Sequence, residues 1–268
     1  TSLASSWDIS WDDENEKEFV LTTKEQLLGL ADLSKTVDFK EKTIKLGKDI
    51  VINKGKAEKW AEKAPKIAWT PISNFAGTFD GQGHEISGLY GKLTNGGAGM
   101  FADTQEGCEI KDFHLVNSYI YSQTSKGTGS IASGGSGTFE HIYTDAIVEC
   151  NGFFCGGIIG NLKDDASLQE CWFDGTITIN GSCAGGIAAS ANDGKSEIKH
   201  CLNTGSVTST YPGPDPAILG GICGSITKKV DIEDTLNVGV IMSEAGLAQV
   251  GGLFGMLSGG TAKIDALW

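Results

Sequence analysis

A glycine step recurs through most of the chain and constrains its fold more than any other feature. Segments such as TGSIAS, GGIIGN and GGICGS each place a small residue and a glycine before an apolar run. The glycines shared by the six copies are Gly99, Gly129, Gly157, Gly186, Gly221 and Gly252, with spacings of 30, 28, 29, 35 and 31 residues. A period of this length is typical of a protein built from stacked repeats.

A second apolar pattern follows each glycine step 10 to 12 residues later. Its first residue is apolar in every copy: Ile110, Phe139, Leu168, Ile198, Ile232 and Ile264. Further apolar residues stand three and nine places on, as Ile142 and Val148 do in the second copy, and Phe113 and Tyr119 in the first. A small residue at the eighth place, such as Gly175, indicates a corner.

These short β-prone runs cannot bury their apolar sides alone. When coils stack, equivalent positions align and form ladders in one continuous core. Three short strands fit a coil of about 29 residues. We therefore expect an all-β fold, a single-stranded right-handed parallel β-helix, with its coils in residues 67–268.

Residues 1–66 lack the repeat and predict an N-terminal cap. TTKEQLLGLADL contains a capping box, Thr23 with Gln26, ahead of apolar positions that suit one face of a helix. Two expected strands, KTIKLG and DIVIN, and a basic insertion at residues 54–66, which can be helical up to Pro65, follow. The helix would cover the open end of the stack, because a bare end strand invites edge pairing. We expect cap and coils to form one structural unit.

The stretch FAGTFDGQGHEISGL, which begins at Phe75, allows two interpretations. Asp80 and His84 could be the working pair of a catalytic loop. Alternatively, Asp80 bonds its own backbone in an Asx turn, His84 bridges to a neighbouring coil, and the glycines allow positive φ at sharp corners. We favour the structural interpretation.

Several motifs occur in a characteristic order along nearly the whole chain. They are WDISW, EQLLGLADL, KDIVI, WTPI and FAGTFDGQGHEISGL, followed by the later GGIxGS and IxxCxNxGSV patterns. In this order the chain resembles bacterial surface proteins with GLUG-type repeats. The resemblance implies a β-helical stalk or module of secreted or wall-attached proteins, including some adhesins and some immunoglobulin A peptidases of Gram-positive bacteria. It implies no catalytic residue. The first two repeats, with GMFAD and GSIAS, lack the double glycine of the pattern.

The charge of the chain narrows the classes of partner. It has 34 acidic residues and 21 basic ones, all of them lysine, which gives a formal charge of −13. Such a surface repels nucleic acid and anionic lipid. Without arginine, no side chain can grip a phosphate or carboxylate in a bidentate way. We expect no nucleic-acid binding, and no membrane insertion, because no apolar run is long enough to cross a bilayer.

A carbohydrate-active enzyme, a β-helical polysaccharide hydrolase or lyase, is one alternative. Pectate-lyase-like sites need an arginine or lysine base beside carboxylate-bound calcium, and the absence of arginine argues against them. Polygalacturonase-like sites use clustered aspartates with a histidine and a basic partner. The pair Asp164–Asp165 lies in LKDDAS, an expected loop without such partners. We expect no catalytic residue and no cofactor.

One position of the repeat alternates carboxylate and imidazole groups. The residues at this position are Asp112, His141, Glu170, His200 and Asp234. In stacked coils they would lie about 4.8 Å apart along one edge. They could form a charge-complementary ladder that raises the imidazole pKa values. They could instead bind a divalent metal through His141, Glu170 and His200, since this ligand set suits zinc.

Exposed aromatic residues are the candidates for ligand binding, because their rings stack on sugars. Trp172 follows an inward position and should face outward, and Tyr143 holds the equivalent place one coil earlier. The two could form a strip that binds a glycan or merely stabilises the surface. Trp7 and Trp11, in an acidic segment, and Trp60, in the basic insertion, are further candidates.

Seven cysteines are present, and the repeat places several of them inside. Cys171 and Cys201 share one inward position, and Cys223 aligns with Ile159 and Ala188. A buried thiol behaves as a small hydrophobic group. The cysteines are therefore reduced core residues, or at least one pair forms a disulfide.

Together these features predict a monomeric, non-catalytic extracellular module of a bacterial surface or secreted protein. It would serve cell adhesion or glycan binding, with a host or environmental glycan or a surface protein as partner. Besides the enzyme, a structural spacer without a ligand remains an alternative. An exposed aromatic strip favours binding, paired carboxylates on adjacent coils favour an enzyme, and featureless sides favour the spacer.

Overall fold

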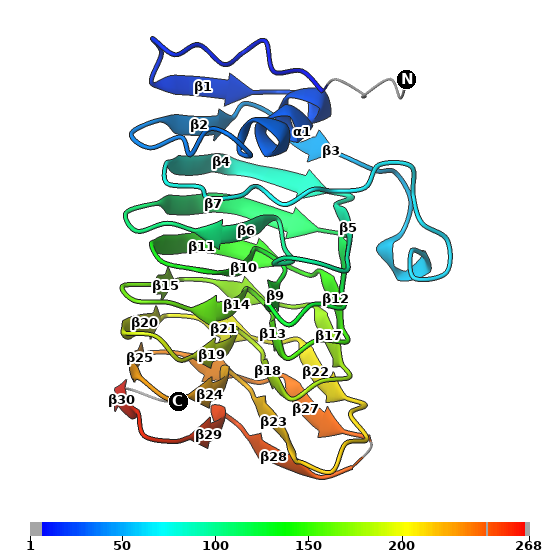
Figure 1. The fold of residues 1–268 in the computed structure, drawn as a ribbon, viewed down its shortest axis with the longest axis vertical. Coiled ribbons are helices and arrows are strands. Elements are labelled where there is room, and N and C mark those ends of the chain that lie inside the picture. Colours follow the sequence, from blue (N-terminus) through cyan, green and yellow to red (C-terminus); the bar gives the residue numbers. More distant parts are fainter. Residues whose placement is uncertain (1–6, 245, 266–268) are drawn as a thin grey trace.

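The protein is a parallel β-helix of about six turns (Figure 1). The structure, a computed structural model, describes residues 7–244 and 246–265. The strands form four parallel sheets of 13, 6, 6 and 5 strands, here named A, B, C and D. Each coil passes through sheets A, C, D and B in turn. The prediction of three strands per coil is therefore wrong, because the glycine step separates one expected strand into two, in sheets D and B.

The strands of each sheet follow the order of the coils. Sheet A contains β1 (Glu18–Leu21), β2 (Thr43–Leu46), β3 (Ile50–Val51), β4 (Thr78–Ser87), β7 (Glu109–Val116), β11 (Thr138–Thr144), β15 (Ser167–Gln169), β16 (Trp172–Phe173), β20 (Lys195–Lys199), β21 (Leu202–Asn203), β25 (Lys229–Glu233), β26 (Leu236–Asn237) and β30 (Thr261–Asp265). Sheet B contains β6 (Phe101–Thr104), β10 (Ala132–Gly135), β14 (Ile159–Leu162), β19 (Ala188–Ala191), β24 (Cys223–Ile226) and β29 (Phe254–Leu257). Sheet C contains β5 (Tyr90–Leu93), β8 (Tyr119–Ser122), β12 (Ile147–Cys150), β17 (Thr176–Ile179), β22 (Ser206–Ser209) and β27 (Val240–Ser243). Sheet D contains β9 (Gly127–Gly129), β13 (Phe154–Gly156), β18 (Cys183–Gly185), β23 (Ala217–Gly220) and β28 (Ala248–Gly251).

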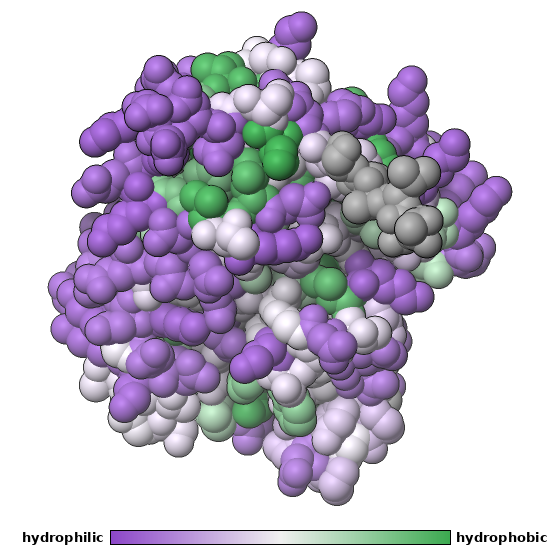
Figure 2. Space-filling view, turned by 45° about the horizontal axis from the view of Figure 1, so that its top comes forward, coloured by the Kyte–Doolittle hydropathy of each residue, from purple (hydrophilic) through white to green (hydrophobic). Residues whose placement is uncertain are grey.

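The apolar repeat positions form ladders inside the stack, as expected. Phe139 pairs with Ile110 on one side and Leu168 on the other, and all three are fully buried. One alignment was wrong: Val148 lies opposite Ile120, so Tyr119 is not the inward residue. The first coil has one residue more at this corner. The face of the molecule seen in Figure 2 is largely hydrophilic, with small hydrophobic groups scattered among the polar residues.

The recurrent glycines are required by the close approach of successive coils. A Cβ atom at Gly157 would lie 2.0 Å from the carbonyl oxygen of Gly186. A Cβ atom at Gly186 would lie 2.2 Å from the carbonyl oxygen of Gly221, and one at Gly221 would lie 2.1 Å from the carbonyl oxygen of Gly252. Real side chains do not come so near to backbone atoms. The backbones of successive coils are in contact at this position. Glycine recurs there because it has no side chain. At Gly252, in the last described coil, a Cβ would meet no atom within 4 Å.

The stretch from Phe75 to Leu89 has the structural role that we favoured. The backbone N–H of Gln82 donates to Asp80 Oδ1 at 2.9 Å, which is the expected Asx contact. His84 Nδ1 lies 3.1 Å from Asp49 Oδ1, so the imidazole does bridge to the neighbouring coil. Gly83 has a φ of 77° at this corner. Asp80 and His84 therefore have contacts that fix a corner of the coil.

The helix α1 (Lys24–Leu33) begins with the predicted capping box of Thr23 and Gln26. Its buried residues Leu27, Leu28 and Leu30 join the main core at the N-terminal end. Strand β1 pairs in parallel with β2, and β2 pairs with β4, so the stack begins before α1. None of the helices in the described part of the chain is long and apolar enough to span a membrane.

The basic insertion is less regular than its sequence allows. Its only helical element among the described residues is the 3-10 helix η1 (Ala57–Lys59), so a helix up to Pro65 does not form. The segment stands off from the stack between β3 and β4 (Figure 1).

The cysteines are core residues in this structure. All seven are buried and free. Cys171 and Cys201 occupy the expected inward place, and Cys223 pairs in register with Ala188. Hydrogen bonding from Cys155 is the main cause that lowers the pKa of Cys150 to about 7. The interpretation as reduced hydrophobic residues therefore describes the structure.

Candidate functional site

An outward-facing run of three rings crosses successive coils of sheet A, with an exposed ring on either side of a half-buried one. In register, Tyr143 of β11 lies beside His114 of β7 on one side and Trp172 of β16 on the other. Each ring directly follows a buried residue in the chain and points outward, because side chains alternate in extended segments. Trp172 is 41% exposed. We name His114, Tyr143 and Trp172 the aromatic strip.

The rings of the strip contact one another edge to face. The ring centres of His114 and Tyr143 are 5.2 Å apart, and those of Tyr143 and Trp172 are 4.9 Å apart. The interplanar angles are 61° and 75°. This is a favoured geometry for aromatic pairs and stabilises their mutual orientation. The predicted pair of Tyr143 and Trp172 is therefore present.

Polar groups on the next outward position fix the ends of the rings. Tyr143 donates its hydroxyl to Asp174 Oδ2 at 3.1 Å, and Trp172 donates Nε1–H to Thr204 Oγ1 at 2.7 Å. Thr204 in turn donates to Asp174 Oδ1 at 2.5 Å. Desolvation and the hydrogen bond to Asp174 raise the pKa of Tyr143 to about 12, so its hydroxyl stays protonated. The strip is thus a preorganised surface beside a carboxylate.

His114 is the member of the strip that sequence reasoning missed. It is exposed and holds the same repeat position as Tyr143 and Trp172. The signal was available, because His114 directly follows the inward Phe113.

The mixed column of carboxylates and imidazoles lies at a bend in sheet A, one position before the inward residues. Its five predicted members have left-handed φ angles, as does Gln82 at the corresponding bend of the preceding coil: Gln82 52°, Asp112 58°, His141 51°, Glu170 53°, His200 52° and Asp234 43°. We name these six residues the corner column. Asp, Asn and His tolerate this conformation better than most residues. The bend therefore accounts in part for the polar residues at this repeat position.

His141 joins three coils of the corner column. Its Nδ1 lies 3.1 Å from Asp112 Oδ1 and its Nε2 lies 2.5 Å from Glu170 Oε2. Desolvation lowers the pKa of His141, but the hydrogen bonds to Glu170 and Asp112 and the charges of Glu170 and Glu140 outweigh it, and the net effect raises the pKa. This geometry is that of a charge-complementary ladder.

The metal set predicted from sequence does not assemble. Glu170 contacts His141, whereas His200 turns to the following coil, with Nδ1 3.6 Å from Asp234 Oδ2. Within the described residues, the set whose potential ligand atoms lie within 4.8 Å of one another is His200, Glu233 and Asp234. Lys199 Nζ lies 3.6 Å from Glu233 Oε2 and supplies an opposite charge there. Side-chain direction, which the alignment does not reveal, separates His200 from Glu170.

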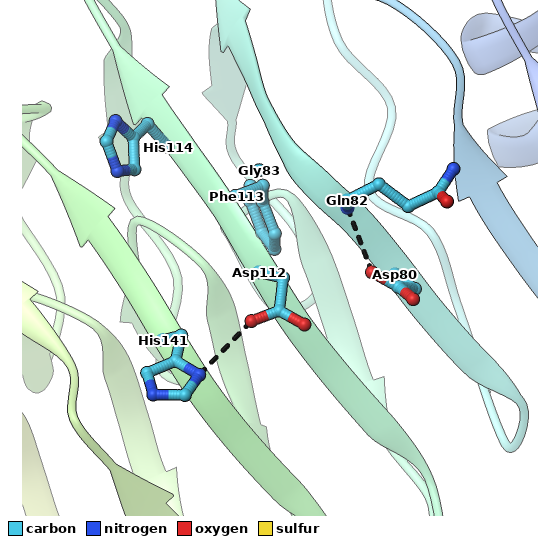
Figure 3. A pocket seen from close by; sticks show the side chains of 7 residues that line it. All are labelled: Asp80, Gln82, Gly83, Asp112, Phe113, His114 and His141. Carbon is cyan, nitrogen blue, oxygen red and sulfur yellow. Dashed lines mark hydrogen bonds and ion pairs between the residues drawn. The ribbon is translucent and has the colours of Figure 1, made fainter.

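A polar hollow of about 420 Å³ adjoins the strip at His114 (Figure 3). Its lining residues are Asp80, Gln82, Gly83, Asp112, Phe113, His114 and His141. They belong to β4, β7 and β11, which pair side by side. Figure 3 shows Asp112 directed to His141 and Asp80 to the backbone of Gln82. Both carboxylates thus already have partners within the hollow.

The three N-terminal tryptophan candidates have packing roles. Trp60 is only 5% exposed and meets Tyr90 edge to face, with ring centres 6.2 Å apart. Trp7 and Trp11 are half-buried against the main core. Trp11 also stacks on Phe39 at 6.1 Å. The prediction that these residues offer open binding faces is wrong for Trp60, and the packing leaves Trp7 and Trp11 only partly accessible.

The aspartate pair lies in a turn before β15. Asp165 has a φ of 58°, and Asp164 Oδ1 accepts a hydrogen bond from the backbone N–H of Lys195 at 2.7 Å. Asp164 thereby ties its loop to the next coil.

The fold and the strip define a class: a parallel β-helix with a ring-bearing outer face. No protein-family model matches the chain. Over 143 residues, 51% of this chain, it is 28% identical to halomucin of Haloquadratum walsbyi, and it spans 2% of that protein's length. A candidate immunoglobulin A1 protease from Bacteroides ovatus, known from its crystal structure, is similar in fold with a TM-score of 0.67. The match covers 91% of this chain and 75% of the other at 20% sequence identity, so it shows the fold alone.

Proposed function

We propose that this chain is a non-catalytic, extracellular module of a bacterial surface or secreted protein, and that it binds glycans through the aromatic strip. The motif order shared with GLUG-type surface proteins and the partial likeness to halomucin support the setting. The observation that carries the binding proposal is the outward-facing run of His114, Tyr143 and Trp172 over three successive coils, in which His114 and Trp172 are exposed and Tyr143 is half-buried.

The strip offers both kinds of contact that a sugar requires. Ring faces pack against the C–H groups of a pyranose, and Asp174 beside the strip accepts hydrogen bonds from hydroxyl groups. Hydrogen bonds to a charged acceptor are stronger than neutral ones. Because the rings are already held by Asp174 and Thr204, binding costs little side-chain entropy. Carboxylates around the strip repel acidic sugars, so its ligand is a neutral glycan.

A glycan array tests this proposal. The double variant Tyr143→Ala/Trp172→Ala removes two of the three rings, and we expect at least about a tenfold loss of affinity, since aromatic anchors commonly carry about 2 kcal/mol or more. Tyr121→Ala is the matched control, because it removes a partly buried tyrosine of sheet C whose hydroxyl accepts a hydrogen bond from Asn151 Nδ2. The affinity of the Tyr121→Ala variant for the glycan should equal that of the parent chain.

Two results would contradict the proposal. Equal affinity of the double variant and the parent chain would place glycan binding elsewhere on the molecule. Absence of binding to every glycan would favour a spacer or a module that binds proteins.

A further inference from the structure

The basic insertion reverses the charge of the molecule locally. Residues 54–66 contain five lysines and two glutamates, a formal charge of +3. The whole chain carries −13, so the other residues together carry −16. At physiological ionic strength, charges farther apart than about 8 Å are largely screened. The local charge of the insertion, rather than the net charge of the chain, therefore governs what an ion meets at its surface.

Specific contacts hold the insertion in place at its base and along its length. Asn53 is 6% exposed, and its Nδ2 donates to the carbonyl oxygens of Ile67 at 2.7 Å and Gly88 at 3.0 Å. The N–H of Ile67 donates back to Asn53 Oδ1 at 3.0 Å. Farther out, Asn117 Oδ1 accepts from the N–H of Ala57 at 2.9 Å. The point at which the insertion leaves and rejoins the stack is thus fixed.

A cavity of about 400 Å³ lies at this base. Three lysines, Lys24, Lys54 and Lys66, line it, and no acidic residue of the described part of the chain does. Its apolar wall includes Val51, Pro65 and Ile67. Lys24 is half-buried, at the first position of α1. The volume falls in the range of small-molecule sites, about 300 to 1,000 Å³.

The three lysines of the cavity have no acidic partner. Among the described residues, none of them has a carboxylate oxygen within 4.0 Å, although Lys42, Lys45 and other lysines do form such ion pairs. In a chain with more acidic than basic residues, three uncompensated ammonium groups around one cavity attract an anion. Lysine is a point charge that does not select planar over tetrahedral anions.

We propose that this cavity binds one anionic sugar residue, with its carboxylate or sulfate group among the lysines and its C–H face on Val51, Pro65 and Ile67. The site shares no residue with the aromatic strip, so it does not depend on the strip binding a glycan. The net negative charge of the chain argues against acidic ligands at the surface of the coils. It does not argue against them at the basic insertion, where the local charge is positive.

Calorimetric titration at low and at physiological salt tests the site. The probes are glucuronate and glucose 6-sulfate, with neutral glucose and inorganic sulfate as controls. We expect saturable binding of one or both anionic sugars, weakened by added salt, and at least tenfold weaker binding of glucose and of sulfate alone. Binding of one anionic sugar only would identify the anion. If glucose binds equally well, the role of the lysines is wrong. If sulfate alone binds equally well, the contact with the sugar body is wrong.

Two lysine pairs of the same insertion separate a defined site from diffuse charge. Lys54→Ala/Lys66→Ala removes two lining residues, and the affinity should fall at least tenfold. Lys56→Ala/Lys63→Ala removes the same charge from exposed residues outside the lining, and the affinity should change less than twofold. Equal losses in both variants, or no binding of either anionic sugar at low salt, would overturn the proposal. All four residues are exposed, so the variants should fold.

Discussion

The inner and outer faces of sheet A obey different rules, although their residues alternate along the same strands. Phe173 points inward and is fully buried, whereas its neighbour Trp172 is 41% exposed. The inward position of Ile110, Phe139 and Leu168 repeats from coil to coil with apolar residues, because each must pack on its equivalents above and below. At the inward position of Phe173, the neighbouring coils place the buried polar residues Thr144 and Asn203. Outward positions at the strip change from His114 to Tyr143 to Trp172. The repeat therefore encodes the fold, and departures from it on the outer face are where function can reside.

The sharpest test of this contrast compares the two neighbours. Phe173→Ala should lower the free energy of unfolding by about 3 to 5 kcal/mol, the usual cost of a cavity left by a buried phenylalanine. Trp172→Ala should lower it by less than about 1 kcal/mol, because an exposed side chain leaves no cavity. Urea unfolding followed by circular dichroism measures both. Equal losses would show that the strip is part of the framework, and its glycan role would lose its main support.

A second test concerns the glycine ladder that lets the coils approach. Gly157→Ala forces a methyl group against the carbonyl oxygen of Gly186 and the ring of Phe173. We expect a loss of about 1 to 3 kcal/mol, as for other overpacked sites. Gly252→Ala is the matched control, since its methyl group would meet no atom within 4 Å, and the change should stay within about 0.5 kcal/mol. Thermal unfolding of both variants checks this, and a larger loss at Gly252 would contradict the ladder.

The inner face could be predicted from sequence because its physical requirement repeats. Ile142 and Cys171 stand at fixed spacing, and any register that buries one buries the other. The same register placed Tyr143 beside Trp172 on the outer face. The number of sheets was not predictable in this way. The corner at each glycine step, as between β13 and β14, does not interrupt the apolar pattern, so the two strands read as one in the sequence.

The errors at the candidate sites concern side-chain contacts that do not recur from coil to coil. Trp60 is buried by Tyr90, which is distant in sequence and matches no repeat. His200 faces Asp234 and not Glu170, because side-chain direction differs between two residues with equivalent backbones. The cavity at the base of the insertion depends on Asn53 closing a segment outside the repeat. Such features need the arrangement of side chains in space.

The smallest expected effect is the pH dependence of His141 on the outer face. Its pKa is raised in the folded protein, above the usual value of about 6.5. Protonated His141 therefore contributes stability fully below about pH 6.5, and this contribution disappears as the pH rises through the folded pKa. The side chain is 48% exposed, so the effect should be below about 1 kcal/mol.

Glu170→Gln should lower the pKa of His141, measured by NMR titration of the imidazole, and should flatten the dependence of stability on pH in this window. Glu106→Gln, which removes the same charge from an exposed turn, is the control and should change neither. A pKa of His141 at or below the usual value in the parent chain would contradict the ladder geometry. A change of stability between pH 6 and 8 that vanishes in Glu170→Gln comes from the outer face, whereas a change that persists in this variant has another source, such as the buried Cys150 thiol, whose pKa is lowered to about 7.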